Sequence, residues 1–436
     1  MDRPPGLMLA FRWITDLSYT PLALRLGAML AAVAVVLGAG CCARILAGHR
    51  AGLVAAVLAA VVLAGPFIQG YQLNGELLAS AVCTWGVAIA VWWRARGAGD
   101  GWLVLAAALA AAAPLVKQSA VDALVAVFAV AIADALARRR VRPVLLAGFG
   151  AAAPLLAAGV WAAADGWSRA WYAVAGFQGG LAGTQSAAGR VSAVVSSLRH
   201  VAPDLVGLAV AALIATVVLA RQRRWLWPVP VWVAAAVLAA GSSPFGHPHY
   251  WVQAVAPLSV LAASVLTTTR ELGAGPRRVA IGALTLAVAV PLAAQGFVLA
   301  RSPSARPAML TGDRRQAADA DVAAWLRAHD PPGATVYAFV GAAELYLLAG
   351  RESGYPYLWY AALQRVPGAL PLLAQVLNDP NGPRYVVVYL SPDSVDPGGQ
   401  LATALRDHFE RAVTVDGYVI LQRRVPAIGS STSSAR

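Results

Sequence analysis

Cysteine, charge and lysine are all scarce in this chain of 436 residues. Its three cysteines, Cys41, Cys42 and Cys83, lie inside apolar stretches, so the polar C-terminal region has neither a disulfide framework nor a zinc motif. The sequence also lacks a P-loop, a G-x-G-x-x-G after a strand, an H-E-x-x-H and a G-x-S-x-G. These absences disfavour nucleotide-driven transport and hydrolysis by serine or zinc.

Charged residues make up only 13% of the chain, whereas hydrophobic residues make up 59% and the mean hydropathy is +0.63. This composition excludes an ordinary soluble protein of this length. Because a membrane-spanning segment must pair its backbone groups internally, the sequence predicts an α-helical polytopic membrane protein. Ten apolar stretches approach the roughly 20 residues that cross a bilayer as a helix, and they lie near residues 21–42, 51–69, 75–93, 102–116, 119–137, 143–164, 201–220, 225–241, 249–267 and 278–299.

The net charge of +13 comes almost entirely from the apolar part of the chain. The first 300 residues hold 21 basic and 9 acidic side chains, and the remainder holds 13 and 12. By the positive-inside rule, arginine-rich loops lie in the cytoplasm and the intervening loops lie outside. Arginines collect in alternate loops, which contain Arg44 and Arg50, then Arg94 and Arg96, then Arg138, Arg139, Arg140 and Arg142, then Arg221, Arg223 and Arg224, and finally Arg270, Arg277 and Arg278.

The loops around residues 70–74, 165–200 and 241–248, and everything after residue 300, are therefore predicted to lie on the outer face. The N-terminal segment 1–20 would also lie outside, although it is basic and no cleavable signal peptide precedes the first apolar stretch. A short N-terminus without an export signal seldom crosses a membrane by itself. One explanation is that related chains carry a preceding span, which is absent here.

Residues 301–425 are predicted to form a small extracytoplasmic α/β domain. The stretch "RRQAADADVAAWLRAHD" has helical spacing and is stopped by "PPG". "TVYAFV" and "YVVVYL" are short apolar runs typical of buried strands, and "AVTVDGYVILQRR" predicts a hairpin with Asp416-Gly417 at its turn. Alternating strands and helices favour an α/β layer structure. The Ser-rich tail 426–436 is predicted to be disordered.

Glu76 opens one of the apolar stretches and is preceded by Asn74. An ionisable residue at membrane depth is costly and is often functional. The alternative is a glutamate at the water interface, stabilised by the N-terminus of its own helix. The sequence leaves both interpretations open.

Lys117 is the only lysine in the chain, and it lies with Gln118 in a short turn between two apolar stretches. An ammonium group at the outer headgroup level can bind a lipid phosphate. The alternatives are a lysine that reaches the membrane surface without a ligand, or a plain pair with Asp122. Because every other basic residue is arginine, a specific site for Lys117 is the favoured interpretation.

"GHPHYW" places His247 and His249 beside Tyr250 and a tryptophan at an outer membrane boundary. A His-X-His pair can ligate a metal. Aromatic belts are common at membrane interfaces, however, so interfacial anchoring with a polar contact is favoured. "GWSRAWY", residues 166–172, is likewise either an aromatic belt or part of a substrate platform.

Together these segments resemble the polytopic GT-C glycosyltransferases, in particular bacterial relatives of the protein O-mannosyltransferase and aminoarabinose transferase families (family 39-like). "DRPPGL" is similar to the acidic–basic–Pro-Pro segment that follows the first outer loop of these enzymes, and "YQLNGELL" to an Asn-x-Glu that opens a later span. "LVKQSA" is similar to their Lys-Gln turn and "HYWVQAVAPL" to a His-Tyr span. Residues 317–424 resemble the outer domain of the same branch, so the likeness covers nearly the whole chain.

The resemblance implies transfer of a sugar from a polyprenyl-phosphate carrier to an acceptor on the outer face. It further implies roles for single residues. The carrier phosphate would be bound by Arg3 and Lys117, and the sugar or acceptor site would be lined by Glu76 and, more weakly, Asp2. The other residues that would bind the substrate or the lipid phosphate are Asn74, Gln118, His249 and Tyr250. The catalytic acid of the family lies on a first outer loop that this sequence does not contain, so Asp2 is only a weak candidate. The absence has two explanations, a truncated N-terminus, which we favour, or a diverged member without catalysis.

We therefore predict a GT-C-like membrane glycosyltransferase with a transmembrane domain over residues 21–300, located in the plasma (cell inner) membrane. Its partners would be a polyprenyl-phosphate sugar, membrane lipids and a glycan, lipid or protein acceptor of the cell envelope, and no nucleic acid. The sequence identifies no cofactor and leaves a divalent metal open. Two alternatives are a transporter or lipid flippase, which is disfavoured because no inverted repeat of broken spans is present, and a non-catalytic assembly subunit.

Overall fold

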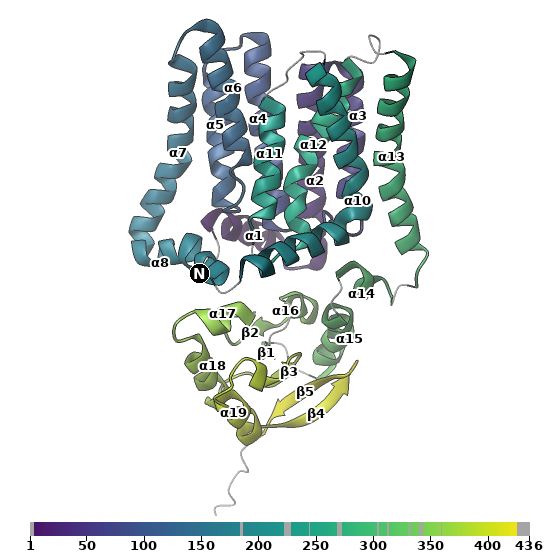
Figure 1. Cartoon of the computed structure of the whole chain (residues 1–436). Helices are drawn as coiled ribbons and strands as arrows, with labels where there is room; N and C mark the ends of the chain where they lie inside the picture. The colour runs from purple at the N-terminus through teal and green to yellow at the C-terminus, as the bar shows by residue number, and fades with distance from the viewer. Residues whose placement is uncertain are drawn as a thin grey trace, which may run out of the picture. The chain divides into compact units, whose positions relative to one another are not determined.

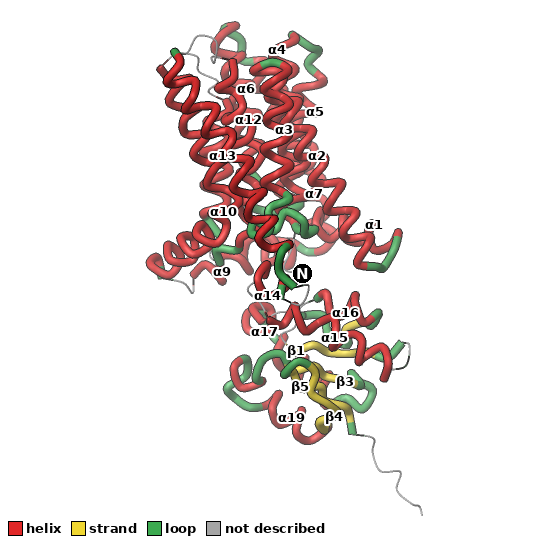
Figure 2. Tube along the Cα trace, turned by 90° about the vertical axis from the view of Figure 1, so that its right-hand side faces the viewer, coloured by secondary structure: helices red, strands yellow, loops and turns green. Residues whose placement is uncertain are grey.

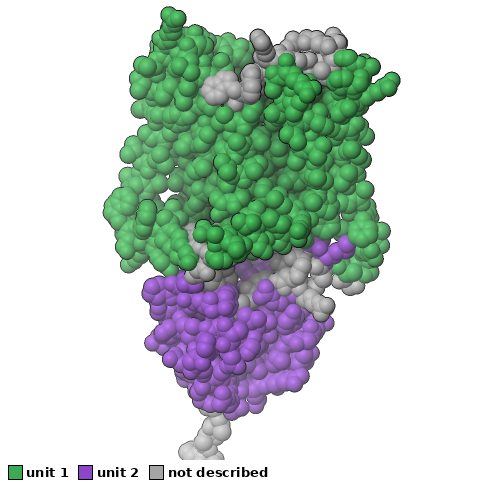
Figure 3. Space-filling view, in the orientation of Figure 1, with its two compact units in different colours: residues 1–306 green, residues 307–436 purple. Residues whose placement is uncertain are grey.

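A computed structural model describes residues 4–183, 186–221, 228–243, 245–267, 273–302, 305–311, 314–329, 331, 333–339, 343–358 and 360–424. The chain divides into two compact units, residues 1–306 and residues 307–436, which Figure 3 colours separately. The tail that was predicted to be disordered, residues 426–436, lies outside the described residues.

The first unit is a bundle of apolar helices that run side by side (Figures 1 and 2). Each apolar stretch predicted from the sequence contains the larger part of one helix. Five of the helices, α2, α4, α7, α10 and α13, are long and apolar enough to cross a membrane. The bundle helices are α2 (Pro21–Ala47), α3 (His49–Leu63), α4 (Gly75–Arg96), α5 (Gly101–Ala112), α6 (Asp122–Arg138), α7 (Arg142–Asp165), α10 (Ala187–Arg221), α11 (Pro228–Gly241), α12 (Val252–Ser264) and α13 (Ala274–Leu299).

Helix α12 lies at the centre of the bundle, and all of its residues from Val252 to Ser264 are buried. It contacts α2, α3, α4, α10 and α11. A helix that is apolar on every side is stable only where other helices surround it, and the sequence of α12 has this character except at Gln253, Ser259 and Ser264. Small residues allow close packing elsewhere, since a Cβ at Gly207 of α10 would lie 2.8 Å from the Cα of Ala287 on α13.

Short helices lie across one end of the bundle, together with the first part of α10 (Figure 1). They are α1 (Pro5–Leu17), α8 (Trp167–Trp171), the π-helical turn η2 (Tyr172–Gly176) and α9 (Phe177–Gly183). The prediction of a long loop over residues 165–200 is therefore wrong, because Trp167, Trp171 and their neighbours have helical spacing despite low overall hydropathy. Exposed Leu9, Trp13 and Leu17 share one face of α1, as in helices that lie in a membrane interface.

The second unit contains helices and one five-stranded sheet, as the sequence predicts for an α/β structure. The sheet order is β2-β1-β3-β5-β4, with β1 parallel to β2 and β3, and with β5 antiparallel to β3 and β4. Asp416 and Gly417 both have positive φ at the turn of the β4–β5 hairpin. The elements are α14 (Arg306–Thr311), α15 (Arg314–His329), β1 (Thr335–Phe339), α16 (Glu344–Ala349), β2 (Glu352–Ser353), α17 (Tyr360–Arg365), α18 (Ala369–Asn378), β3 (Tyr385–Val388), α19 (Gln400–His408), β4 (Phe409–Val415) and β5 (Tyr418–Arg423).

The structure confirms the predicted fold class, a helical membrane protein with a C-terminal α/β region. One polar contact is built into the core of that region. Asp319 of α15 is fully buried and accepts a hydrogen bond from the hydroxyl of Tyr389, which directly follows β3 in sequence. Burial and the neighbouring carboxylate raise the pKa of the Tyr389 phenol far above its usual value, so the hydroxyl remains a donor.

We expect Tyr389→Phe to lower the free energy of unfolding of the C-terminal unit by about 2 kcal/mol, because the buried Asp319 carboxylate loses a charge-assisted hydrogen bond. Limited proteolysis of the full chain in detergent, followed over a urea series, measures this loss. Tyr360→Phe serves as control, since Tyr360 is exposed and its hydroxyl only accepts a bond from Gln364. Equal protease resistance of the wild type and Tyr389→Phe would contradict the prediction.

Candidate functional site

Glu76 and Lys117 form a close ion pair at one end of the helix bundle. The ammonium nitrogen of Lys117 lies 2.6 Å from Oε1 of Glu76, and the two side chains are 13% and 3% exposed. Glu76 lies in the first turn of α4, where Asn74 caps the helix by accepting a hydrogen bond from Leu77 N at 2.8 Å. Lys117 follows the 3-10 turn η1 (Ala113–Leu115) and precedes α6. The pair therefore joins the starts of two neighbouring helices.

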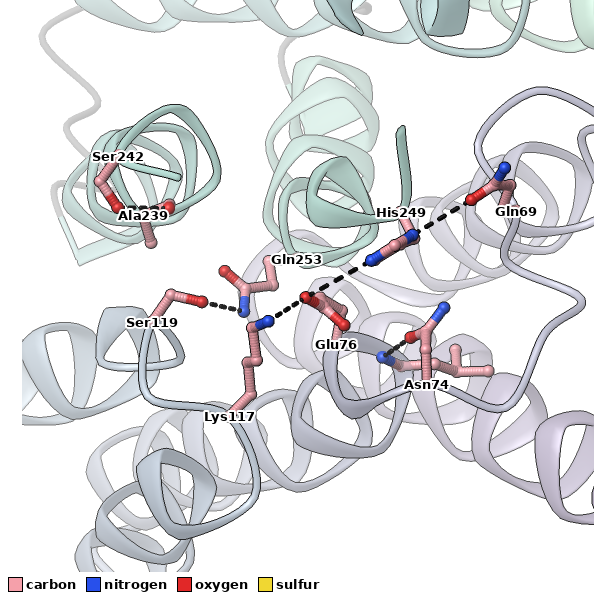
Figure 4. A network of polar contacts seen from close by, with 10 residues as sticks. Gln69, Asn74, Glu76, Lys117, Ser119, Ala239, Ser242, His249 and Gln253 are labelled. Atoms are coloured by element: carbon pink, nitrogen blue, oxygen red, sulfur yellow. Dashed lines mark hydrogen bonds and ion pairs between the residues drawn. The ribbon is translucent and has the colours of Figure 1, made fainter. Parts of the chain in front are cut away.

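His249 extends this pair into a row of four side chains, which Figure 4 shows. It lies in the 3-10 helix η3 (Pro248–Trp251), with Nε2 3.9 Å from Glu76 Oε1 and Nδ1 3.1 Å from Gln69 Oε1. Tyr250, the next residue, presents its ring to the ammonium group of Lys117 at 4.7 Å. The row thus runs Lys117, Glu76, His249, Gln69.

A second polar contact lies beside this row. Gln253 of α12 donates from Nε2 to Ser119 Oγ at 3.1 Å, which fixes the turn that carries Lys117. Three amide atoms nearby are buried and form no hydrogen bond with the described residues: Asn74 Nδ2, Gln118 Nε2 and Gln253 Oε1. Buried polar atoms without partners are costly, so they indicate a place where a polar ligand completes the hydrogen bonding.

The structure brings together Asn74, Glu76, Lys117, His249 and Tyr250, which the sequence analysis had singled out separately. Gln118 lies in the same turn as Lys117. Asp2 and Arg3 fall outside the described residues. Sequence reasoning missed three members of the cluster, Gln69, Ser119 and Gln253, because neutral polar residues at helix ends carry no distinctive local pattern.

Two alternatives raised for these residues are wrong. Lys117 does not pair with Asp122, because the Asp122 carboxylate is buried and accepts from Trp232 Nε1 at 2.8 Å. Glu76 does begin a helix, but with only 2% of its surface exposed it is not a solvated interfacial residue. It is a buried charge that is stabilised by a buried partner.

The cluster does not have the composition of a metal site. No group of three or more His, Cys, Asp or Glu side chains that could hold a metal ion occurs in the part of the chain that the structure describes. His247 and His249 stack face to face, with ring centroids 5.3 Å apart, so they do not converge on one point. The described residues therefore do not fit a metal ion, and we assign no chemical step to one.

Comparison with known proteins shows what the chain is similar to. The family of dolichyl-phosphate-mannose-protein mannosyltransferases matches residues 2–162. ArnT from Cupriavidus metallidurans bound to undecaprenyl phosphate has a similar structure, with a TM-score of 0.62 at 16% identity, covering 98% of this chain and 88% of that chain. The chain shares the fold of ArnT, and its N-terminal part is similar to the mannosyltransferase family.

Further structures have the GT-C fold. ArnT from the same organism in its apo state gives a TM-score of 0.60 at 14% identity, covering 96% of this chain and 87% of that chain. The archaeal oligosaccharyltransferase AglB from Archaeoglobus fulgidus, in complex with an inhibitory peptide and a dolichol-phosphate, gives a TM-score of 0.47 at 13% identity. This match covers 96% of this chain and 66% of that chain. No curated protein matches the sequence with statistical significance.

The opposite end of the helices that carry the cluster is strongly basic. Helix α4 begins at the cluster and ends at Arg94 and Arg96, and α6 begins beside Lys117 and ends at Arg138. Asp134 is buried and pairs there with Arg138 at 3.0 Å and with Arg94 at 3.9 Å. The cluster and the arginines predicted to be cytoplasmic thus lie at opposite ends of two apolar helices.

Proposed function

We propose that this chain transfers a sugar from a polyprenyl-phosphate carrier to an acceptor on the extracytoplasmic face of the cell membrane. The observation that carries the proposal is the buried Lys117–Glu76 pair with His249 beside it. A leaving phosphate needs cationic stabilisation, and an ammonium group in a water-poor site supplies it more strongly than one in bulk water. The positive-inside rule supports the outer face, since arginines lie at the far ends of α4 and α6.

An apolar groove between two helices suits the lipid part of such a donor. It lies between α6 and α11, has a volume of about 500 Å³, and is lined by Leu124, Val125, Phe128, Ala129, Ile132 and Val231. Leu124 lies in the first turn of α6, close in sequence to Lys117. We assign the polyprenyl chain to this groove, with its phosphate toward the end of α6 that follows Lys117. The ArnT structure bound to undecaprenyl phosphate has the same fold, which agrees with a donor of this class.

The roles of single residues follow from this proposal. Lys117 would bind the carrier phosphate, and Tyr250 would limit the positions of the ammonium group. The unpaired amide atoms of Asn74, Gln118 and Gln253 would bind hydroxyl groups of the sugar or acceptor. The match of residues 2–162 to a mannosyltransferase family disfavours a transporter or flippase, whereas an assembly subunit would keep the fold and lack transfer.

Sugar transfer in membranes tests the proposal. Membranes containing the chain are supplied with polyprenyl-phosphate sugars labelled on the sugar, and label leaving the carrier pool is followed. We expect transfer by the wild-type protein expressed from its full reading frame. We expect the same of its Arg142→Ala variant, which removes only an exposed ion pair with Asp100 at the far end of the bundle. We expect none from Lys117→Met combined with Glu76→Gln. Equal release from membranes with and without the chain would favour the assembly-subunit alternative.

A further inference from the structure

One face of helix α10 contacts both segments that bring Gln69 and His249 together. Ser197, His200 and Asp204 are spaced three and four residues apart, so they lie on the same side of the helix. Trp251, at the end of η3, donates from Nε1 to Ser197 Oγ at 2.9 Å. The His200 ring packs edge-on against Phe67 with centroids 5.5 Å apart. Helix α10 thus touches the 3-10 helix that carries His249 and the segment that precedes Gln69.

Asp204 makes the strongest of these contacts. Its side chain is fully buried, and Oδ2 accepts hydrogen bonds from the backbone N–H groups of Phe67 at 2.6 Å and Ile68 at 2.7 Å. Gly65 permits this approach, since a Cβ at that position would overlap the carboxylate. Burying a carboxylate in an apolar bundle is costly unless it is hydrogen-bonded, and such residues in membrane helices are usually retained for a purpose beyond packing.

The two bonded N–H groups directly precede Gln69. Gln69 has φ 58°, a left-handed conformation that is uncommon for a residue other than glycine. Because the backbone at Phe67 and Ile68 is fixed, the direction of the Gln69 side chain is fixed as well. Gln69 then meets His249 Nδ1 at 3.1 Å, and the opposite ring nitrogen faces Glu76 (Figure 4).

We propose that Asp204 is a positioning residue of the transfer site. By fixing the backbone of Phe67 and Ile68 it places Gln69 against His249, and Gln69 holds the imidazole ring beside Glu76. Asp204 therefore acts on the Lys117–Glu76 pair through Gln69 and His249, without touching substrate. The expected effect of Asp204 on sugar transfer rests on the proposed function. Its expected effect on the position of the His249 ring rests on the contacts alone.

Asp204→Ala, Gln69→Ala and the double variant test this inference. Alanine has no acceptor for the two N–H groups, so the backbone before Gln69 is released. We expect each single variant to lower kcat by about tenfold to a hundredfold with little change in KM for the donor, as small displacements of a reacting group do. The double variant should lose no more than the worse single variant, because both act through the same path.

Gln295→Ala is the matched control, because Gln295 donates to the carbonyl of Val61 on the helix before the same segment and lies outside the row. The Gln295→Ala variant should have the same kcat as the wild type. If the fold-loss of kcat in the double variant equals the product of the fold-losses in the two single variants, the two residues act independently and the inference is overturned.

A spectroscopic readout separates this inference from the proposed function. In protein labelled with ¹⁵N-histidine, the ring signals of His249 are assigned by their loss in His249→Asn. Asp204→Ala and Gln69→Ala should shift these signals in the same way, and Gln295→Ala should not. If the wild type shows no transfer, the proposed function fails, and the His249 signals still decide the inference. Unshifted signals in Asp204→Ala would overturn it.

Discussion

Removal of the Lys117 charge is expected to weaken binding of polyprenyl phosphate by at least about 30-fold. A charge-assisted hydrogen bond to phosphate in a buried site contributes about 2 kcal/mol, which corresponds to that factor. Affinity for radiolabelled polyprenyl phosphate, measured on purified protein in detergent, tests this. The neutral polyprenol of the same chain length is the control ligand, because its binding to the α6–α11 groove does not use the ammonium group.

A substitution of Lys117 also changes the environment of Glu76, because the two side chains form an ion pair. Lys117→Ala alone leaves the buried Glu76 carboxylate without its 2.6 Å partner, which costs about 3–5 kcal/mol when a buried pair is broken. The informative variant is therefore Lys117→Met combined with Glu76→Gln, which removes both charges and preserves the volume. If this double variant binds polyprenyl phosphate as tightly as the wild type, Lys117 does not bind the carrier phosphate.

The sequence predicts the bundle well because the bilayer imposes a strong and simple pattern. Long apolar stretches and alternating arginine loops were sufficient to place Lys117, Glu76 and His249 at the same end of the helices. The hairpin at Asp416-Gly417 was also predictable, since few residue pairs accept positive φ at both turn positions. In each case the prediction depends on residues that are close together in the sequence.

The parts that were missed depend on contacts between residues far apart in the chain. Asp204 bonds the backbone of Phe67 and Ile68 across 137 and 136 positions, and neither end of this contact has a distinctive motif. The left-handed Gln69 could not be expected either, because glutamine carries no preference for that conformation. The short helices over residues 167–183 were interpreted as part of a loop because they are too short and too polar to be found in a search for long apolar spans.

These missed contacts change the interpretation of the site. From the sequence, Lys117 and Glu76 were two independent candidates, one for phosphate and one for sugar or acceptor. In the structure they are partners, and the cation that would bind the carrier phosphate is already neutralised by a carboxylate. An incoming phosphate must either share Lys117 with Glu76 or displace it. On the proposed function, Glu76 would therefore oppose donor binding while it contributes to the geometry of the site.

Glu76→Gln is accordingly expected to separate binding from transfer. The neutral amide releases Lys117 from its ion pair, so affinity for polyprenyl phosphate should stay the same or increase. Transfer should fall by about a hundredfold or more, because the row from Lys117 to His249 loses the charge at its centre. Measuring kcat for the labelled donor together with donor affinity on the same preparation shows whether the two effects have opposite directions.

Asp122→Asn is the matched control for this prediction. Asp122 is also a buried carboxylate in the first turn of a helix at the same end of the bundle, and its bond from Trp232 Nε1 can be accepted by an asparagine oxygen. It should retain transfer and donor affinity. If Glu76→Gln instead loses expression, donor affinity and transfer in equal proportion, Glu76 has a structural role only. A loss of transfer at undiminished affinity, seen in Glu76→Gln and absent from Asp122→Asn, would show that the carboxylate is needed at the step after the donor is bound.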